Sequence, residues 1–267
     1  MSLPLPAWAE SGRSPRAVLF LHGVGGGKEL WHRQIDHLAQ RGYRAIAWDA
    51  PGYGDSPAPV RFDWPELREA LLRLLDHLAI GRVALVGHSM GGMIAQDFAA
   101  EHPERLAALV LSGTSAAFGN PDGAFQQKFL AARLGPLDAG GTMAELAPGI
   151  VREVIGTSAD PDGVALATEV MARVPDATYR AAIAALVTFD RRAALSTIAV
   201  PTLVLAGEND RNAPPAMMER MAARIPHARY VCLARAGHLA NVEQPSAFEM
   251  ALDDFLDALE PSAWISD

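Results

Sequence analysis

The sequence has little cysteine, no long apolar run and no basic leader. Its 267 residues include one cysteine, Cys232, so a disulfide within the chain is excluded. Cys232 lies in the apolar run 230–233, which predicts a buried thiol rather than a nucleophile. No window approaches the ~20 apolar residues of a membrane span, and the first ten residues lack the features of a signal peptide. We therefore expect a soluble cytoplasmic protein that does not bind membranes.

Positive charge is also scarce. The chain has 23 basic and 31 acidic residues, a net charge of −8, and no run of like charges. This balance argues against nucleic acid or an anionic membrane as the main partner. A chain of this length buries roughly three quarters of its unfolded surface, so we expect one large domain or a domain with an insertion.

Short apolar runs alternate with amphipathic helical patterns over most of the chain. Six runs, each followed by turn residues, are predicted to be strands: 17–23, 43–49, 82–88, 106–113, 201–207 and 228–234. Runs of this kind are typical of strands buried on both faces of a parallel sheet. Before one predicted helix, Asp63 and Glu66 suggest a capping box, and Gly81 is expected to end that helix. Repeated β-α-β units predict a wound sheet with helices on both sides.

Residues 118–198 interrupt this alternation. They are rich in alanine and other helix formers, and proline, glycine and aspartate separate the helical stretches. No convincing strand is evident there. We expect a helical cap over these residues, inserted into a core formed by residues 1–117 and 199–267.

The glycine-rich stretch HGVGGGKEL, residues 22–30, does not fit a nucleotide-binding loop. A phosphate-binding loop needs Ser or Thr after Gly-Lys, but Glu29 follows Lys28, and Gly23 is one residue out of register. The dinucleotide pattern GxGxxG also fails, because its last glycine would fall at Lys28. The function of this loop must therefore be inferred from the rest of the chain.

The strongest chemical signal is GHSMG at residues 87–91, a G-x-S-x-G pattern between a predicted strand and a predicted helix. A sharp strand-to-helix turn exposes the serine hydroxyl, and its neighbours must be small because strand and helix nearly touch. Ser89 is therefore the predicted nucleophile. An ordinary serine in a glycine turn is the alternative.

A serine hydroxyl needs a base and an acid that orients the base. His238 follows the last predicted strand, where a loop can reach Ser89. Asp210 follows the strand 201–207 and is the predicted acid, with Glu208 as the fallback. Asp49 and Asp55 lie among glycines and are interpreted as structural, turn-forming residues.

The loop at residues 22–27 now has a role. Acyl transfer needs two N–H donors for the developing oxyanion, and we expect them from Val24 and Met90. Glycines beside Val24 let the backbone approach a substrate closely. The walls of the substrate pocket are predicted at Gly23, His88 and Trp31.

The stretches LFLHGVGG, DAPGYGDS, GHSMGG, LAGENDRNAPP and GHLANVEQP together resemble the α/β-hydrolase superfamily over nearly the whole chain except the insertion. The segment after Ser89 and the HLANVEQP tail are most similar to 3-oxoadipate enol-lactonases. The resemblance implies a mostly parallel sheet and hydrolysis of an ester or lactone through an acyl-enzyme. It implies Ser89, Asp210 and His238 as the triad.

Two features depart from the family pattern. Only about 16 residues precede the first central strand, where the family usually has two edge strands, so a shortened sheet is expected. The cap carries no motif that identifies a substrate. An anionic lactone would need a cation in the pocket, and the candidates, each also interpretable as a surface charge, are Lys128, Arg133, Arg152 and Arg211.

Other functions remain open from the sequence. The same triad cleaves carbon–carbon bonds of ring-fission products in some members of the superfamily, and others are cofactor-free perhydrolases. A ligand-binding receptor that keeps the pocket is the non-enzymatic alternative. We expect no cofactor and no metal site, because the histidines lack compact spacing with carboxylates or Cys232. The expected partner is a small-molecule ester or lactone, and the oligomeric state is left open, a homo-oligomer included.

Overall fold

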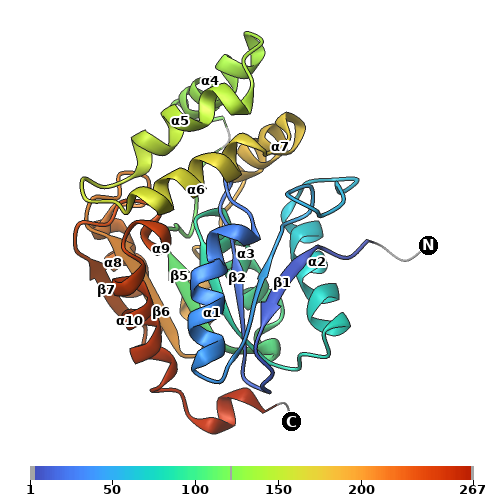
Figure 1. Cartoon of the computed structure of the whole chain (residues 1–267), viewed down its shortest axis with the longest axis vertical. Coiled ribbons are helices and arrows are strands. Elements are labelled where there is room, and N and C mark those ends of the chain that lie inside the picture. Colours follow the sequence, from blue (N-terminus) through green and yellow to red (C-terminus); the bar gives the residue numbers. More distant parts are fainter. Residues whose placement is uncertain (1–3, 121, 266–267) are drawn as a thin grey trace.

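The computed structural model describes residues 4–120 and 122–265. In this part of the chain, seven strands form one sheet in the order β1-β3-β2-β4-β5-β6-β7 (Figure 1). Only β1 is antiparallel to its neighbour, β3, and the other neighbours are parallel. The strands are β1 (Trp8–Ser11), β2 (Ala17–Leu21), β3 (Arg44–Trp48), β4 (Val83–His88), β5 (Leu106–Ser112), β6 (Thr202–Gly207) and β7 (Arg229–Leu233).

The six predicted strands and the wound parallel sheet are confirmed. Strands β2, β4, β5 and β6 are buried along their whole length, as their continuous apolar runs require. The sequence did not predict β1, a four-residue edge strand that is half-buried and carries no apolar run. With one strand before β2, the sheet is shortened at this edge.

Helices cover both faces of the sheet. On one face, α1 (His32–Gln40) and α10 (Pro245–Leu256) bury their apolar sides against the strands. On the other face lie α2 (Trp64–His77), α3 (Met90–Glu101) and α8 (Pro215–Ala222). Short helical turns complete the core: η1 (Lys28–Trp31), η2 (Pro103–Arg105), η3 (Leu195–Thr197), α9 (Ala240–Glu243) and η4 (Pro261–Trp264).

Four helices are inserted between β5 and β6 and lie across one end of the sheet (Figure 1). They are α4 (Ala124–Asp138), α5 (Met143–Val154), α6 (Pro161–Ala172) and α7 (Asp176–Leu186). All four fall within the range 118–198, and we call them the cap. The division into a core and a cap with those boundaries stays a prediction.

Two local expectations were wrong. The side chain of Asp63 accepts a hydrogen bond from the Glu66 N–H, but the Glu66 carboxylate binds Arg73, so the capping box is one-sided. Helix α2 ends at His77, well before Gly81, and Ala79 takes the left-handed backbone conformation with φ +53°. A hydrogen bond from the Ile80 N–H to the Leu75 carbonyl closes the turn around Ala79.

The predicted burial of Cys232 was also wrong. Cys232 is exposed because β7 is the edge strand of the sheet and is mostly open to solvent, unlike the central strands. An apolar run alone does not distinguish an edge strand from a central one. None of the helices in residues 4–120 and 122–265 is long and apolar enough to cross a membrane.

Candidate active site

Ser89 occupies a strained turn between β4 and α3. Its φ and ψ angles are +52° and −117°, a conformation rare for a residue with a side chain. The turn is tight on both sides: a Cβ at Gly87 would collide with the carbonyl of Gly91, and a Cβ at Gly91 would collide with the carbonyl of Leu21. The small residues of the G-x-S-x-G pattern are therefore required by backbone contacts.

Three side chains from distant parts of the sequence form a hydrogen-bonded row at this turn. The Ser89 hydroxyl lies 3.0 Å from Nε2 of His238, and Nδ1 of His238 lies 2.8 Å from Oδ2 of Asp210. A carboxylate only accepts, so Nδ1 carries the proton and Nε2 is free to accept from the hydroxyl. The arrangement can therefore transfer the serine proton to the imidazole.

Asp210 remains charged although it is only 3% exposed. Burial opposes the charge, but His238 and the N–H groups of Ala213 and Asn212 outweigh burial and lower the pKa of the Asp210 carboxyl. The fallback acid, Glu208, instead accepts a hydrogen bond from the Arg235 N–H. The structure thus brings Asp210, and not Glu208, to His238.

Gly113, which directly follows β5, has little room for a side chain beside the Asp210–His238 pair. Its φ is +51°, and a Cβ there would lie 3.3 Å from Asp210 Oδ2 and 3.3 Å from His238 Nδ1. The Asp210–His238 pair therefore fills the space that another side chain would need. This crowding fits the absence of a carboxylate at residues 113–115.

The loop at residues 22–27 lies against the Ser89 hydroxyl. A Cβ at Gly23 would be 3.0 Å from Cβ and 3.5 Å from Oγ of Ser89, so Gly23 lies against the Ser89 side chain. Its place in the wall of the substrate pocket stays a prediction. The Gly23 carbonyl accepts hydrogen bonds from the Gly26 N–H at 3.0 Å and from His22 Nδ1 at 2.8 Å. In the trans peptide between Gly23 and Val24, the Val24 N–H points in the opposite direction to the Gly23 carbonyl. Val24 and Met90 as oxyanion donors stay predictions.

His22 was missed by the sequence reasoning. Its Nε2 accepts from the Ala50 N–H at 3.0 Å, so Nδ1 must carry the proton that it donates to Gly23. Burial lowers the pKa of His22, which keeps the ring neutral and this tautomer fixed. The only signal in the sequence was its position beside Gly23, before the glycine loop.

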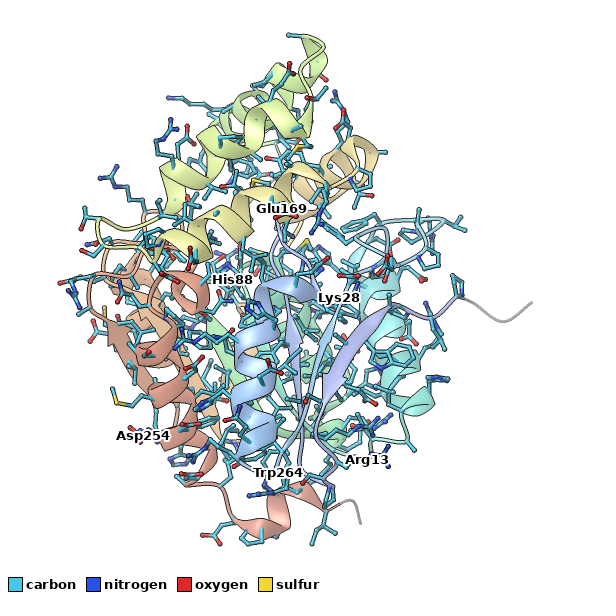
Figure 2. The ribbon with its side chains drawn as sticks, viewed as in Figure 1. Arg13, Lys28, His88, Glu169, Asp254 and Trp264 are labelled. Atoms are coloured by element: carbon cyan, nitrogen blue, oxygen red, sulfur yellow. The ribbon has the colours of Figure 1, made fainter. Side chains whose placement is uncertain are left out.

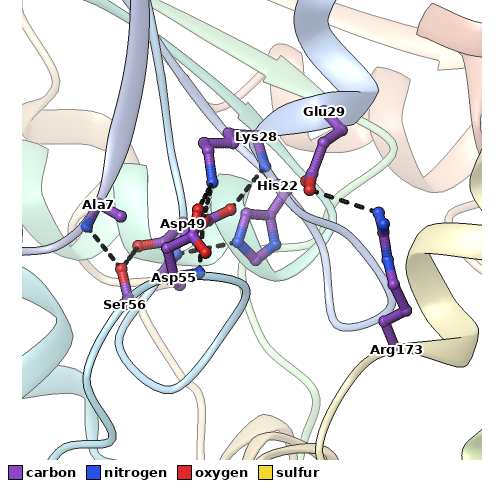
Figure 3. Close-up of polar contacts among 9 residues, drawn as sticks. Ala7, His22, Lys28, Glu29, Asp49, Asp55, Ser56 and Arg173 are labelled. Carbon is purple, nitrogen blue, oxygen red and sulfur yellow. Dashed lines mark hydrogen bonds and ion pairs between the residues drawn. The ribbon is translucent and has the colours of Figure 1, made fainter.

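An ion-pair network supports the same loop (Figure 3). The fully buried Asp49 accepts from the Lys28 N–H at 2.9 Å and the Asp55 N–H at 3.1 Å, and Lys28 Nζ binds both carboxylates. Burial opposes the charge on Lys28, but hydrogen bonds to the two aspartates outweigh it and raise its pKa. Asp49 and Asp55 therefore have the structural role that the sequence predicted. Lys28 holds a protein carboxylate rather than a phosphate.

The place of His88 in the pocket wall stays a prediction. The His88 side chain is 4% exposed and packs beneath His238, with ring centroids 4.8 Å apart. Figure 2 shows His88 and Lys28 at the level where the cap meets the core. Burial, followed by the neighbouring His238, lowers the pKa of His88 to about 3, so the ring is neutral.

Trp31 is not a pocket residue. It is 1% exposed and stacks on Phe20, with Phe248 on α10 also in contact, in the layer between the sheet and α1 and α10. Trp31, Ile35 and Leu38 form one apolar stripe that packs in the core. The Trp31 side chain therefore cannot reach a ligand.

The four candidate pocket cations are exposed or ion-paired, and a role for any of them in the pocket stays a prediction. Lys128, Arg152 and Arg211 are exposed, and Arg133 of α4 donates to Glu153 of α5 at 3.2 Å. Within the described residues, no group of three or more His, Cys, Asp or Glu side chains could hold a metal ion.

Comparison with known proteins identifies the family. Residues 16–245 match the family model described as alpha/beta hydrolase fold. The chain therefore belongs to this family, and it is a hydrolase of the α/β fold.

Individual relatives differ in the reactions named for them. The chain is 33% identical over 246 residues to a RutD protein of Variovorax paradoxus, provisionally named a carbamate hydrolase (90% of this chain and 91% of that protein). It is 30% identical over 253 residues to 3-oxoadipate enol-lactonase 2 of Acinetobacter baylyi (92% and 91%). A thermophilic esterase from Thermogutta terrifontis superposes with a TM-score of 0.86 at 28% identity (95% and 93%).

Proposed function

We propose that this protein is a serine hydrolase that cleaves a carboxylic ester or lactone through an acyl-enzyme intermediate. The observation that carries the proposal is the 3.0 Å separation between Ser89 Oγ and His238 Nε2, with Asp210 2.8 Å behind the imidazole. A partly exposed serine with this arrangement performs nucleophilic acyl transfer on unrelated folds. The names of the enol-lactonase and esterase relatives support the choice of ester or lactone.

In the first half of the reaction, Ser89 Oγ attacks the substrate carbonyl carbon while His238 Nε2 takes the hydroxyl proton. Asp210 stabilises the resulting imidazolium. The N–H groups of Val24 and Met90 bind the oxyanion. The bond from the carbonyl carbon to the leaving oxygen then breaks, and that oxygen takes the proton from His238.

In the second half, a water molecule replaces the leaving group. His238 Nε2 takes a proton from this water as its oxygen attacks the acyl carbon. The bond to Ser89 Oγ breaks, Oγ regains the proton, and the carboxylic acid is released. For a lactone, the alcohol and the acid are two ends of one product. No cofactor takes part in either half.

Other reactions of the same three side chains are hydrolysis of a carbon–carbon bond in meta-cleavage products, perhydrolysis and carbamate hydrolysis, the last from the RutD relative. A panel of an enol-lactone, p-nitrophenyl esters of increasing acyl length, a vinylogous 1,5-diketone and an N-alkyl carbamate separates the hydrolytic reactions by kcat/KM. We expect the esters or the lactone to rank first. A diketone or carbamate in first place would replace the proposed substrate class.

Ser89→Ala tests the nucleophile itself. On p-nitrophenyl acetate we expect kcat to fall by up to ~10⁶-fold, which leaves only binding and oxyanion stabilisation. Wild-type protein treated with a phosphonofluoridate should gain one adduct on Ser89, located by mass spectrometry. An active Ser89→Ala variant would reject this serine, and a wild type without turnover on any panel member would favour the receptor alternative.

A further inference from the structure

The loop that carries His238 is held by a single buried carboxylate. Residues 234–239, which we call the histidine loop, have no regular structure between β7 and α9. The N–H groups of Gly237 and Leu239, on either side of His238, donate to Oε2 and Oε1 of Glu243 at 2.8 and 2.7 Å. Both carboxylate oxygens are therefore used to fix the residues that flank the imidazole.

Other contacts of the histidine loop come from the cap and from the loop after β6, where Glu208 accepts from the Arg235 N–H and the Asn209 N–H donates to the Ala236 carbonyl. The His238 N–H donates to the Val154 carbonyl at the end of α5, at 2.8 Å. Oε2 of Glu243 accepts a second bond, from the Gly156 N–H at 2.6 Å, and the Glu243 main-chain carbonyl accepts from the Asp160 N–H at 3.0 Å. Glu243 thus joins two segments, residues 154–160 of the cap and the histidine loop.

The two segments meet through backbone alone. A Cβ at Gly156 would collide with the carbonyl of Arg235 and lie 2.9 Å from the Gly237 nitrogen. A Cβ at Gly237 would likewise collide with the Gly156 nitrogen. With no room for a side chain at either glycine, the separation of the two segments is set by hydrogen bonds, and three N–H donors reach the Glu243 carboxylate.

The chemistry of Glu243 also points to a role in positioning. The residue is 1% exposed, and burial raises the pKa of its carboxyl although three N–H groups and His238 favour the charged form. A buried carboxylate is weak evidence for stability, because an apolar side chain of similar volume is often no worse. An apolar side chain could not, however, accept three N–H groups from two segments.

We propose that Glu243 is a positioning residue whose carboxylate locks the histidine loop against the cap and so keeps the His238 imidazole between Ser89 and Asp210. This inference rests on the proposed function for its effect on turnover. Through Glu243, the position of the base His238 depends on how α5 and α6 pack against the core. Glu243 does not touch the reacting atoms.

The experiment compares two variants that disturb this junction with one matched control. Glu243→Gln keeps the size of the side chain but turns one acceptor into an NH₂ group that must face a backbone N–H. Gly156→Ala leaves Glu243 intact and forces the cap segment away from the loop. The control is Glu249→Gln, a 7% exposed carboxylate on α10 that binds Arg33 and Gln34 of α1.

Each variant is measured in three ways. The first is kcat and KM on p-nitrophenyl acetate. The second is the downfield ¹H resonance of the His238 Nδ1 proton, which is deshielded by its bond to Asp210 and broadens if the imidazole moves. The third is amide hydrogen exchange at Gly237 and Leu239. The last two readouts need no turnover, so they test Glu243 even if the protein hydrolyses no ester.

We expect Glu243→Gln and Gly156→Ala to lower kcat by about 10- to 100-fold, with KM within threefold of the wild type. The Nδ1 proton should broaden and both amides should exchange faster. Glu249→Gln should keep kcat within twofold even if its melting temperature falls equally. A sharp Nδ1 resonance with unchanged amide exchange in folded Glu243→Gln would overturn the proposal. If Glu243→Gln does not fold, unchanged kcat in Gly156→Ala would do so.

Discussion

The core and the cap of this hydrolase are built from different kinds of contact. In the core, glycines and charged groups are fixed by atoms packed against them, as at Gly91 under Leu21 or Asp49 beside Lys28. Away from its contacts with the core, the cap has glycines such as Gly149 with open space around them, and the ion pair of its Arg173 with Glu29 of η1 is exposed. The core should therefore tolerate few substitutions at such positions, whereas the cap should tolerate many more.

The difference also divides the chemistry. Side chains proposed for bond breaking stand on the ends of core strands, and the cap approaches them at two places. Val154 and Gly156 bond the histidine loop and Glu243. A Cβ at Gly25, in the glycine loop, would collide with Met171 of α6. The cap thus rests on the loops that hold the base and the predicted oxyanion site.

After Ser89 itself, the largest effect is expected at Asp210. Asp210→Asn should lower kcat by about 10⁴-fold, because an amide in place of the carboxylate favours the wrong imidazole tautomer and cannot stabilise the imidazolium. Steady-state hydrolysis of p-nitrophenyl acetate measures the loss. Glu208→Gln, two residues away, is the control and should stay within twofold, because the glutamine amide oxygen can still accept from the Arg235 N–H. Equal losses would mean that the acid is assigned wrongly.

Much of the core was predictable from the sequence. Continuous apolar runs gave β2, β4, β5 and β6, because strands covered on both faces need apolar side chains at every position. The same rule failed at the two edges of the sheet. It missed β1 and misjudged Cys232, because edge position depends on strand order, which no local pattern records.

The candidate site was predictable where backbone geometry demands a residue type. Ser89 was found because its turn needs glycine on both sides, and His238 and Asp210 follow strands in the expected order. Glu243 and His22 were not found, because their importance depends on which N–H groups the fold brings to them. The prediction that Trp31 lines the substrate pocket was wrong, because a residue near a functional loop can equally face the core.

The stability that ion pairs contribute offers a second way to compare the core with the cap. Lys28→Ala should reduce the free energy of unfolding by about 3 kcal/mol, because it leaves the buried Asp49 carboxylate without a cation. Arg173→Ala removes an exposed pair to Glu29 at 3.4 Å and should change it by less than about 1 kcal/mol. Urea unfolding of both variants gives the two values. Similar losses of unfolding free energy in the two variants would contradict the distinction between core and cap.

Acid should weaken the core through its buried histidines, since residues 118–198 contain none. Native His88 has a pKa of about 3 against the ordinary histidine value of 6.5, so below pH 6.5 the unfolded chain binds a proton that the native state does not bind. The free energy of unfolding therefore falls as pH falls from 6.5 toward 3, by up to about 1.4 kcal/mol per pH unit for this group. His22, whose pKa is also lowered, acts in the same direction.

The measurement is urea unfolding of the wild type and of His88→Gln between pH 7 and pH 5. Other titrating groups contribute equally to both proteins, so the difference between them isolates His88. The wild type should lose about 2 kcal/mol more than the variant over this range. Parallel curves would show that His88 is protonated in the folded protein.

The smallest effects are expected at two cap glycines that differ only in backbone conformation. A Cβ at either Gly149 or Gly140 would meet no atom within 4 Å. Gly149 lies inside α5, so Gly149→Ala should raise the free energy of unfolding by about 0.5–1 kcal/mol, because alanine loses less backbone entropy in a helix. Gly140 has a φ of +91°, so Gly140→Ala should lower it by about 1 kcal/mol. Urea unfolding measures both, and kcat should not change in either variant.

If Gly149→Ala lowered kcat, the interior of the cap would be as tightly coupled to the site as the strand ends are, and the contrast between the two regions would fail.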